Sequence, residues 1–266
     1  MNVLTITRAP KFSPNSVEKD LAIMQAVTAR LLRLGHSVTM MPEEEVVGLT
    51  THYGADTCII TMGRLPQTVE WLRGQDARTI NTADAVETAS SRTVLTQMMQ
   101  RNHLPMPPLH GDKGYWLKRD DARTQQPGDV KFCRTAADLK SGIDEFARRG
   151  IGDFVVSAHV EGDLLKFYGV RNTGFFRYYY PTDDGLSKFG NERHNGSARH
   201  YPFSLYAMRR DIGHLAALIG IDVYGGDCIV RPDGSYCIID FNDWPSFSRC
   251  REQAAEAIVK LITDEL

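Results

Sequence analysis

Three oxygen-bearing side chains near the end of the chain have the types and the spacing that could bind a divalent cation. Asp227 lies in a β-rich segment, a Pro-Asp-Gly turn follows at 232–234, and Asp240 and Asn242 lie in a second β-rich segment. Because the turn joins the two segments into an antiparallel hairpin, Asp227 can lie across from Asp240 and Asn242. Carboxylate and amide oxygens suit Mg²⁺, whose coordination is usually completed by water and substrate phosphates. The pattern therefore predicts a magnesium site.

A solvated hairpin is the alternative interpretation, since aspartate and asparagine are common near turns. The apolar residues Ile238 and Ile239 favour the metal site, because a charge at the end of an apolar strand is costly to bury unless it is paired or bound to a metal. Side chains alternate between the two faces of a strand. We therefore expect Ile239 and Phe241 to point into the core, opposite Asp240 and Asn242.

The metal-binding hairpin of the ATP-grasp superfamily carries an aspartate or glutamate, then Glu-x-Asn or Asp-x-Asn, then a short loop with proline or glycine. This chain resembles it at Asp227, at Asp240-Phe241-Asn242 and at Trp244-Pro245. The Asp-x-Asn form is similar to that of the inositol phosphate kinases, whereas most carboxylate–amine ligases carry Glu-x-Asn. The resemblance implies ATP and Mg²⁺ as cofactors, with the metal held by Asp227, Asp240 and Asn242.

The composition is that of an ordinary soluble protein. Of 266 residues, 42% are hydrophobic and 24% are charged, and the net charge is −2, so nothing draws the chain to nucleic acid or to a membrane. We expect a small-molecule anionic substrate, and a homodimer only because dimers are the commonest assembly. No apolar run is long enough to span a membrane, which makes the cytoplasm the expected location. Five cysteines without a Cys-x-x-Cys pair argue against a disulfide framework and a zinc site.

Strands and helices alternate in residues 1–104, which predicts an open α/β domain with a parallel sheet. Strands are expected at 3–7, 36–41 and 57–62, and the first helix is expected at 16–34. No Gly-x-Gly-x-x-Gly follows the first strand, so a dinucleotide site is not expected. Three polar residues stand there instead and belong either to a ligand site at the end of a strand or to a plain surface loop: Arg8, Lys11 and Ser13.

Residues 105–157 resemble the smaller ATP-grasp lobe, with a strand, a polar loop, a second strand and a helix in order. Lys118 matches the strand-end lysine that contacts nucleotide phosphate in the superfamily, although Lys-Arg replaces the usual Lys-Pro. Lys131 is a second candidate for nucleotide binding. A solvated strand end is the alternative for Lys118. The helix expected at 84–102 belongs to a segment that resembles the one leading into the ATP-grasp lobes, where a basic residue often precedes the helix interior, and Arg92 would be that residue.

Two apolar strands joined by a short polar link follow, and in the superfamily such a link holds adenine through its backbone. By position the link is Ala158-His159-Val160, and Glu161 or Asp163 would contact the ribose hydroxyls. His159 is either a catalytic base or, as a plainer alternative, a hydrogen-bonded structural histidine. Lys166 lies inside the second apolar strand, where it either snorkels to water or meets the transferred phosphoryl group or the substrate.

A locally basic segment runs from Lys188 to Arg210 and is expected to be loop-like until a helix begins near Leu205. It would complement an anionic substrate and the charge that develops during phosphoryl transfer, or it is solvated surface. The catalytic candidates are two arginines of this segment and the lysine of the preceding strand: Arg193, Arg199 and Lys166. The aromatic strand at 174–181 is expected to pack in the core rather than to stack on nucleic acid.

Taken from about residue 79 to the end, the resemblance implies an ATP-grasp fold: an α/β domain (1–104), then two α+β lobes (105–157 and 158–266) that clamp ATP. Most members of the superfamily form an acyl phosphate that an amine attacks, which favours a carboxylate–amine ligase. The Asp-x-Asn motif and the basic segment favour a small-molecule kinase that phosphorylates a hydroxyl. An ATP-binding module with little turnover is the third alternative, because no side chain is an evident general base.

Overall fold

The computed structural model describes residues 1–120, 126, 128–184 and 194–264, which form three sheets. The first is parallel, has the strand order β2-β1-β3-β4, and consists of β1 (Asn2–Thr7), β2 (Ser37–Pro42), β3 (Thr57–Thr61) and β4 (Arg78–Ile80). One face packs on α1 (Val17–Arg33), and the other packs on α2 (Glu43–Val46), α3 (Pro66–Arg73) and α4 (Ala83–Ser90). A short 3-10 helix, η1 (Pro10–Phe12), follows β1. The predicted open α/β unit is confirmed.

The expected single helix at 84–102 is wrong, because the chain forms two helices, α4 and α5 (Arg92–Arg101). Ser91 separates them in an extended conformation, with φ −103° and ψ 112°. Its side-chain oxygen accepts a hydrogen bond from the Val94 amide at 3.2 Å, so it caps the start of α5. Arg92 is therefore the first residue of α5 and precedes the interior of that helix, as expected for this basic residue.

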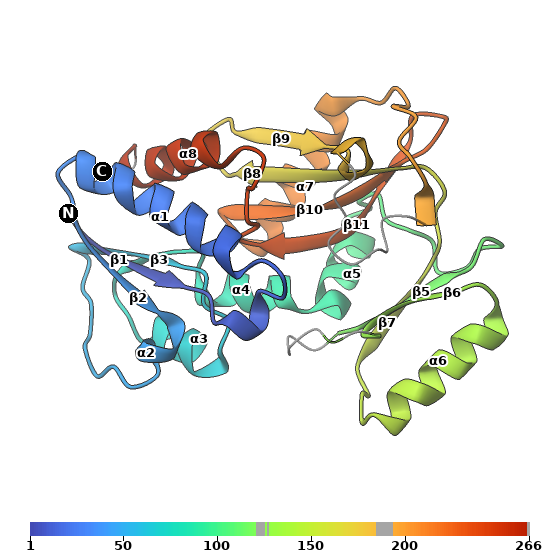
Figure 1. Cartoon of the computed structure of the whole chain (residues 1–266), viewed down its shortest axis with the longest axis horizontal. Helices are drawn as coiled ribbons and strands as arrows, with labels where there is room; N and C mark the ends of the chain where they lie inside the picture. Colours follow the sequence, from blue (N-terminus) through green and yellow to red (C-terminus); the bar gives the residue numbers. More distant parts are fainter. Residues whose placement is uncertain (121–125, 127, 185–193, 265–266) are drawn as a thin grey trace.

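The second sheet is small and antiparallel, with the order β6-β5-β7. One of its faces is covered by the amphipathic helix α6, which begins with the capping box that Thr135 and Asp138 form. In Figure 1, α6 lies along one side of this sheet. The elements are β5 (Tyr115–Arg119), β6 (Val130–Cys133), α6 (Ala136–Arg148) and β7 (Phe154–Ala158).

The third sheet is antiparallel, with the order β11-β10-β8-β9, and α7 covers one of its faces. The predicted hairpin is its β10–β11 pair, joined at the Pro-Asp-Gly turn. Phe176 of β9 is buried in the core, as expected for the aromatic strand. The elements are β8 (Asp163–Val170), β9 (Phe176–Tyr179), η2 (Pro181–Asp184), α7 (Leu205–Ile219), β10 (Val223–Val230), β11 (Tyr236–Asp243) and α8 (Arg251–Thr263).

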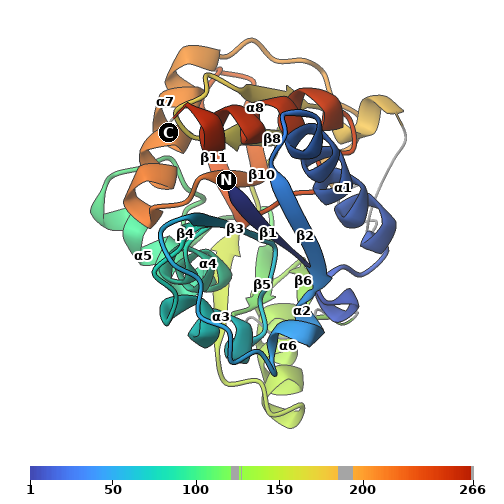
Figure 2. The ribbon, with the colours of Figure 1, turned by 90° about the vertical axis from the view of Figure 1, so that its left-hand side faces the viewer.

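The last helix returns to the first part of the chain. In Figures 1 and 2, α8 lies beside α1, and both termini are found at the same end of the molecule. One buried cluster combines residues of α1, β3, β8 and α8, among them Val27, Ile60, Val170 and Ile258. The parallel sheet and the third sheet therefore share a core. The domain limits 1–104, 105–157 and 158–266 remain predictions.

All five cysteines are buried and free. Cys228 pairs in register with Ile238, and Cys237 pairs with Ile229, so the two hairpin cysteines do not face each other. They are buried packing residues. Among the described helices, none has the length and apolar character needed to cross a membrane.

Candidate active site

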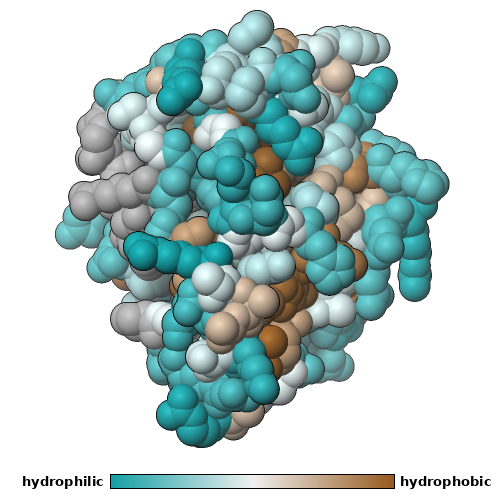
Figure 3. Space-filling view, turned by 90° about the vertical axis from the view of Figure 1, so that its right-hand side faces the viewer, coloured by the Kyte–Doolittle hydropathy of each residue, from teal (hydrophilic) through white to brown (hydrophobic). Residues whose placement is uncertain are grey.

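A cleft of about 630 Å³ lies where the three sheets meet, a size that suits a small-molecule ligand. Its walls come from the loop after β1, the start of α5, the free face of the small sheet and the free face of the third sheet. Viewed from the side of the small sheet, most of the surface is hydrophilic, and hydrophobic side chains gather in a band near its centre (Figure 3).

The strand register arranges the wall formed by the third sheet in rows. Leu164 and Ile229 are cross-strand partners and form an apolar row. Two residues further along, a polar row crosses four strands and contains Tyr179, Lys166, Asp227 and Asp240. The next row begins with Tyr168 on β8, passes through Gly225 and ends at Asn242. Alternation with period two thus brings the three predicted metal ligands together in one wall.

The two carboxylates of the polar row differ in charge environment. Burial raises the pKa of Asp227, although Lys166 contacts it with Nζ at 3.0 Å from Oδ1. Burial also opposes ionisation of Asp240, but the charges of Arg92 and Lys118 outweigh it, so the pKa of Asp240 is lowered. Two adjacent carboxylates that face three cations can exchange those partners for a metal and a polyphosphate.

A β-bulge corrects the expectation for Ile239. Asp227 pairs with Asp240 while the next residue, Cys228, pairs with Ile238, so Ile239 is an additional residue in β11. It is half-buried in the cleft wall rather than in the core, whereas Phe241 is buried as predicted, with 2% exposure. The extra residue breaks the alternation and brings an apolar side chain and a carboxylate to the same face.

Lys118 reaches the site from the small sheet. Its Nζ donates to the Ile239 carbonyl at 2.8 Å, and burial lowers its pKa while Asp240 opposes that shift. Arg92 lies beside it at the start of α5 and donates from Nη1 to the Arg119 carbonyl at 2.8 Å. Its buried Nε contacts no acceptor among the described residues. Both cations are therefore placed to meet an anionic ligand.

The link between β7 and β8 lies in the cleft as expected, and its three residues, 158–160, all line it. The Ala158 amide donates to the Pro108 carbonyl at 2.8 Å, and the His159 amide donates to the Gly114 carbonyl at 2.8 Å. The loop before β5 therefore holds the link in place. The indole nitrogen of Trp116 donates to His159 Nδ1 at 3.1 Å, and burial lowers the pKa of that imidazole. These contacts support the structural interpretation of His159 over that of a catalytic base.

Two residues proposed for ribose lie elsewhere. Glu161 is exposed, and its carboxylate lies 4.0 Å from Lys113 Nζ. Asp163 is 3% exposed, and its two oxygens accept from the backbone amides of Arg199 at 2.7 Å and Tyr201 at 2.8 Å. Its hydrogen bonds hold the loop before α7, and neither carboxylate is among the described residues that line the cleft.

Two of the predicted basic residues, Lys131 and Arg199, are not gathered in the cleft either. Lys131 lies on the face of β6 that packs on α6, because Val130 takes the cleft side, and it forms an ion pair with Glu145. The side chain of Arg199 is exposed, and only its backbone amide makes the contact to Asp163. Arg193 lies outside the described residues.

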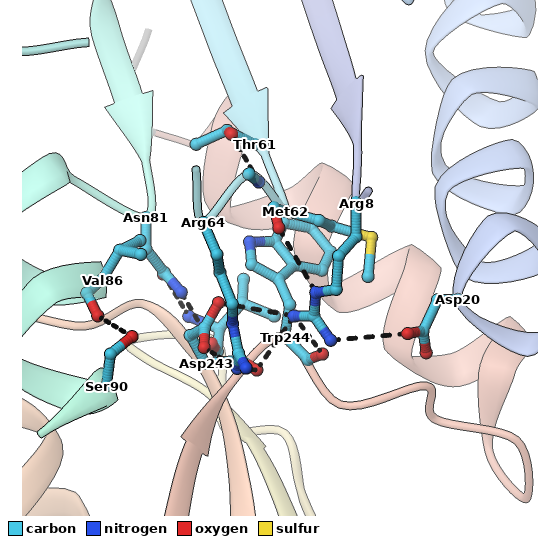
Figure 4. A network of polar contacts seen from close by, with 12 residues as sticks. Arg8, Asp20, Thr61, Met62, Arg64, Asn81, Val86, Ser90, Asp243 and Trp244 are labelled. Atoms are coloured by element: carbon cyan, nitrogen blue, oxygen red, sulfur yellow. Dashed lines mark hydrogen bonds and ion pairs between the residues drawn. The ribbon is translucent and has the colours of Figure 1, made fainter. Parts of the chain in front are cut away.

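The structure adds residues that the sequence left open or did not single out. Arg8 and Arg64, from the loops after β1 and β3, converge on the buried carboxylate of Asp243 (Figure 4). Arg8 also donates to the carbonyl of Trp244 at 3.1 Å. The available signal was the position of both arginines at the carboxyl ends of neighbouring parallel strands, where α/β sheets bind ligands.

Comparisons with known proteins support the fold. No protein-family model and no curated protein sequence matches the chain. The structure is similar to D-alanyl-alanine synthetase A from Vibrio cholerae, with a TM-score of 0.71 and 11% identity over 99% of this chain and 98% of that one. It also resembles the D-alanine-D-alanine ligase from Coxiella burnetii, with a TM-score of 0.67 and 9% identity over 100% and 97%.

A third similar structure is an ATP-grasp RimK-domain protein from Sphaerobacter thermophilus, with a TM-score of 0.62 and 13% identity. The match covers 98% of this chain and 99% of that one. The similarity extends over the parallel sheet and both antiparallel sheets, in the order that the sequence predicts. The chain therefore has the ATP-grasp fold.

Proposed function

We propose that this protein is a Mg²⁺-ATP-dependent ligase that joins a carboxylate to an amine through an acyl phosphate. The observation that carries the proposal is the polar row of the third sheet, in which Asp227 and Asp240 lie side by side with Asn242 one row further. These residues face cations from two other elements inside one cleft. Of the similar structures, one is named as a D-alanine-D-alanine ligase and another as a D-alanyl-alanine synthetase, which favours this reaction over others of the fold.

The donor set fits Mg²⁺. Two carboxylates and one amide oxygen are hard ligands, and the described residues contain no group of three or more histidines, cysteines or acids that could form a protein-only cage. Such an incomplete set suits a metal whose coordination is completed by phosphates. When bound there, Mg²⁺ would neutralise phosphate charge and polarise the transferred phosphoryl group.

The apolar part of the cleft would hold adenine. Val130 of the small sheet lies on one side, and three apolar residues of the third sheet, Leu164, Ile229 and Ile239, lie on the other. Val160 of the link closes this part of the wall. A flat ring between two apolar surfaces buries both of its faces.

The phosphates would extend from there to the polar row. Lys118 and Arg92 approach from the side of the small sheet, and Lys166 approaches from β8. On binding, phosphate oxygens would take up donors that now contact Ile239 and Asp227. Exchange of a protein acceptor for a phosphate keeps each buried cation paired.

The acceptor would bind beyond Asn242, where the loop after β1 faces the end of β9. Lys19 and Arg249 line this part together with Tyr179, whose ring packs 5.5 Å below the Arg249 guanidinium. A small carboxylate is the anion that fits these groups. Its oxygen would attack the γ-phosphorus of ATP as the bond to the bridging oxygen breaks and ADP leaves. An amine would then attack the acyl carbon and displace phosphate, and lose a proton to solvent.

A small-molecule kinase is the second candidate, and Asp240 favours it, because the Asp-x-Asn form resembles inositol phosphate kinases. The same cations would then hold a phosphorylated or polyhydroxylated acceptor. The homodimer and the cytoplasmic location remain predictions.

Nucleotide and phosphate products distinguish the reactions. The protein is incubated with Mg²⁺, ATP and one of two pools, carboxylic acids with amines or polyols with sugar phosphates. ADP with free phosphate, formed only when acid and amine are both present, supports the ligase. If the γ-phosphate of ATP is labelled, ADP formed without free phosphate and label recovered in a polyol contradict the ligase and support the kinase. Absence of acceptor-dependent turnover in both pools contradicts both enzymes and supports a nucleotide-binding module.

A further inference from the structure

We propose that Arg8 and Arg64 are positioning residues for the metal site, and that they act by holding Asp243, the neighbour of the metal ligand Asn242. The inference rests on the proposed function, because it takes Asn242 as a ligand of Mg²⁺. It adds a role for the parallel sheet, which supplies both arginines and contributes no proposed metal ligand.

The carboxylate of Asp243 is shared by the two guanidinium groups. Its side chain is fully buried, Oδ2 lies 3.4 Å from Arg8 Nη2, and Oδ1 is paired with Arg64 Nη2. The Asp243 carbonyl accepts from the same two nitrogens at 3.3 and 3.4 Å. A buried carboxylate with an arginine on each oxygen has a fixed orientation, because each pairing restricts rotation of the other.

Arg8 cannot move independently of this contact, because its other donors are occupied. Its Nε donates to the Met62 carbonyl at 3.3 Å, and Nη1 lies 3.4 Å from Asp20. Ser13 donates to the same oxygen of Asp20 at 2.6 Å, which fixes that carboxylate. The Arg8 side chain is only 7% exposed. Arg8 therefore connects the parallel sheet to the end of β11 through fixed contacts, and it is not free to move toward a ligand (Figure 4).

One buried acid fastens the two arginine-bearing loops to each other. Glu43 has no exposed surface, and its carboxylate accepts from the Ala9 amide at 2.9 Å and from the amides of Arg64 and Leu65. Burial raises the pKa of this carboxyl group, whereas the three amide donors lower it. The loops after β1 and β3 are thus held at a fixed separation, and both arginines reach Asp243 as one unit.

The turn after β11 links this unit to the metal ligand. Trp244 has a φ of +37°, which a residue with a side chain rarely adopts, and its carbonyl is held by Arg8 at 3.1 Å. Pro245 then packs on Gly225 so closely that a Cβ on this glycine would lie 2.8 Å from the ring. Gly225 is the cross-strand partner of Asn242. The position of the Asn242 amide is therefore fixed on both sides of the strand pair.

The contact also pairs a third carboxylate next to the metal ligand. Asp243 follows Asn242 directly and its side chain is fully buried, so without the two arginines it would be an unpaired buried charge. Pairing with Arg8 and Arg64 neutralises it. Residues that orient metal ligands without touching the metal typically contribute about 10- to 100-fold to metal affinity.

Metal affinity, measured apart from turnover, tests the proposal. Mn²⁺ is titrated into the full-length protein with a non-hydrolysable ATP analogue, and bound metal is followed by electron paramagnetic resonance. Arg64→Met and Asp243→Asn are each expected to weaken Mn²⁺ binding about tenfold or more. The Arg64→Met/Asp243→Asn double variant should bind Mn²⁺ no more weakly than Asp243→Asn alone, because both changes remove the same contact. Arg64→Lys, which keeps the charge, should recover part of the loss.

Arg78→Met is the matched control. Arg78 also extends from the parallel sheet to a distant element, where it donates to the carbonyl of Leu261 in α8 at 3.0 Å, but it lies away from the cleft. We expect this variant to lower the melting temperature and to leave Mn²⁺ affinity unchanged.

The outcomes separate this proposal from the proposed function. If the unaltered protein binds Mn²⁺ with nucleotide and Arg64→Met changes only the melting temperature, as Arg78→Met does, the arginines are merely structural and the inference is wrong. If the unaltered protein binds no Mn²⁺ with nucleotide, the proposed function is wrong and the inference falls with it. Should Arg64→Met fail to fold, Arg64→Lys gives the same comparison, and unchanged affinity in it contradicts the inference.

Discussion

At the scale of single residues, the site depends on the two carboxylates of Asp227 and Asp240 and on the cations that lie near them. Asp240 has a lowered pKa because Arg92 and Lys118 outweigh the effect of its burial. Asp227 is held by Lys166 at 3.0 Å. Each carboxylate lies near a cation that a metal could replace, and each of these cations could then contact a phosphate.

Loss of a metal ligand should abolish turnover and leave the fold intact. Asp240→Asn and Asn242→Ala are each expected to reduce Mg²⁺-dependent ADP formation by about 10²-fold or more, the scale of removing one electrostatic contact to a reacting group. Circular dichroism should remain close to that of the unaltered protein. Normal activity in both variants would show that the metal binds elsewhere.

Lys118 and Lys131 provide a matched pair on adjacent strands. Lys118→Ala should weaken ATP binding about tenfold or more, because a hydrogen bond to a charged group is worth about 1.5–3 kcal/mol. Lys131→Ala should leave ATP affinity unchanged, since this side chain lies on the α6 face with Glu145. Isothermal titration of ATP into both variants measures the difference. Equal affinities would remove Lys118 from the site.

At the scale of elements, the hairpin shows both the reach and the limit of sequence reasoning. Alternation and the Pro-Asp-Gly turn predicted two paired strands and the convergence of Asp227, Asp240 and Asn242. The bulge at Ile239 could not be predicted in this way, because it is set by packing across the sheet and leaves the local pattern of residue types unchanged. The same limit applies to Lys131: which face of the sheet its side chain occupies depends on the register of β6, which the local sequence does not specify.

Close backbone approach in the hairpin makes Gly226 irreplaceable. A Cβ there would lie 2.2 Å from the Asp240 carbonyl and 2.5 Å from the ring of Phe167. We expect Gly226→Ala to lower the free energy of unfolding by about 1–3 kcal/mol, as overpacking does. Gly213→Ala is the control, because open space surrounds this glycine inside α7 and alanine should stabilise the helix by about 0.5–1 kcal/mol. Urea denaturation of both variants measures the two changes. A Gly226→Ala protein as stable as the unaltered one would contradict this account of the hairpin.

The link between β7 and β8 should make stability depend on pH. Because burial lowers the pKa of His159, the folded protein favours its neutral form. The stability that depends on it is complete above the ordinary pKa of about 6.5 and is lost progressively as the pH falls from that value through the lower pKa of the folded protein. Melting temperatures at pH 8 and pH 5.5 should therefore differ less in Trp116→Phe, which removes the indole donor to Nδ1. An unchanged difference would contradict this role of the histidine.

At the scale of the whole molecule, the order of elements could be predicted, and the contacts that unite them could not. The three sheets appear in the predicted order, since local patterns specify strands and helices. Arg64 meets Asp243 across 179 positions, and α8 packs on α1 across the whole chain, contacts that no local pattern encodes. The hydrogen bonds of Asp163 could not be predicted for the same reason: its partners, Arg199 and Tyr201, come from a distant loop.

The most direct test of the account is a structure of the protein with Mg²⁺ and a non-hydrolysable ATP analogue. We expect adenine between Val130 and Leu164, the phosphates beside Lys118, and a metal at about 2.1 Å from oxygens of Asp240 and Asn242. A nucleotide bound outside this cleft, or a metal that contacts neither residue, would contradict the proposed function.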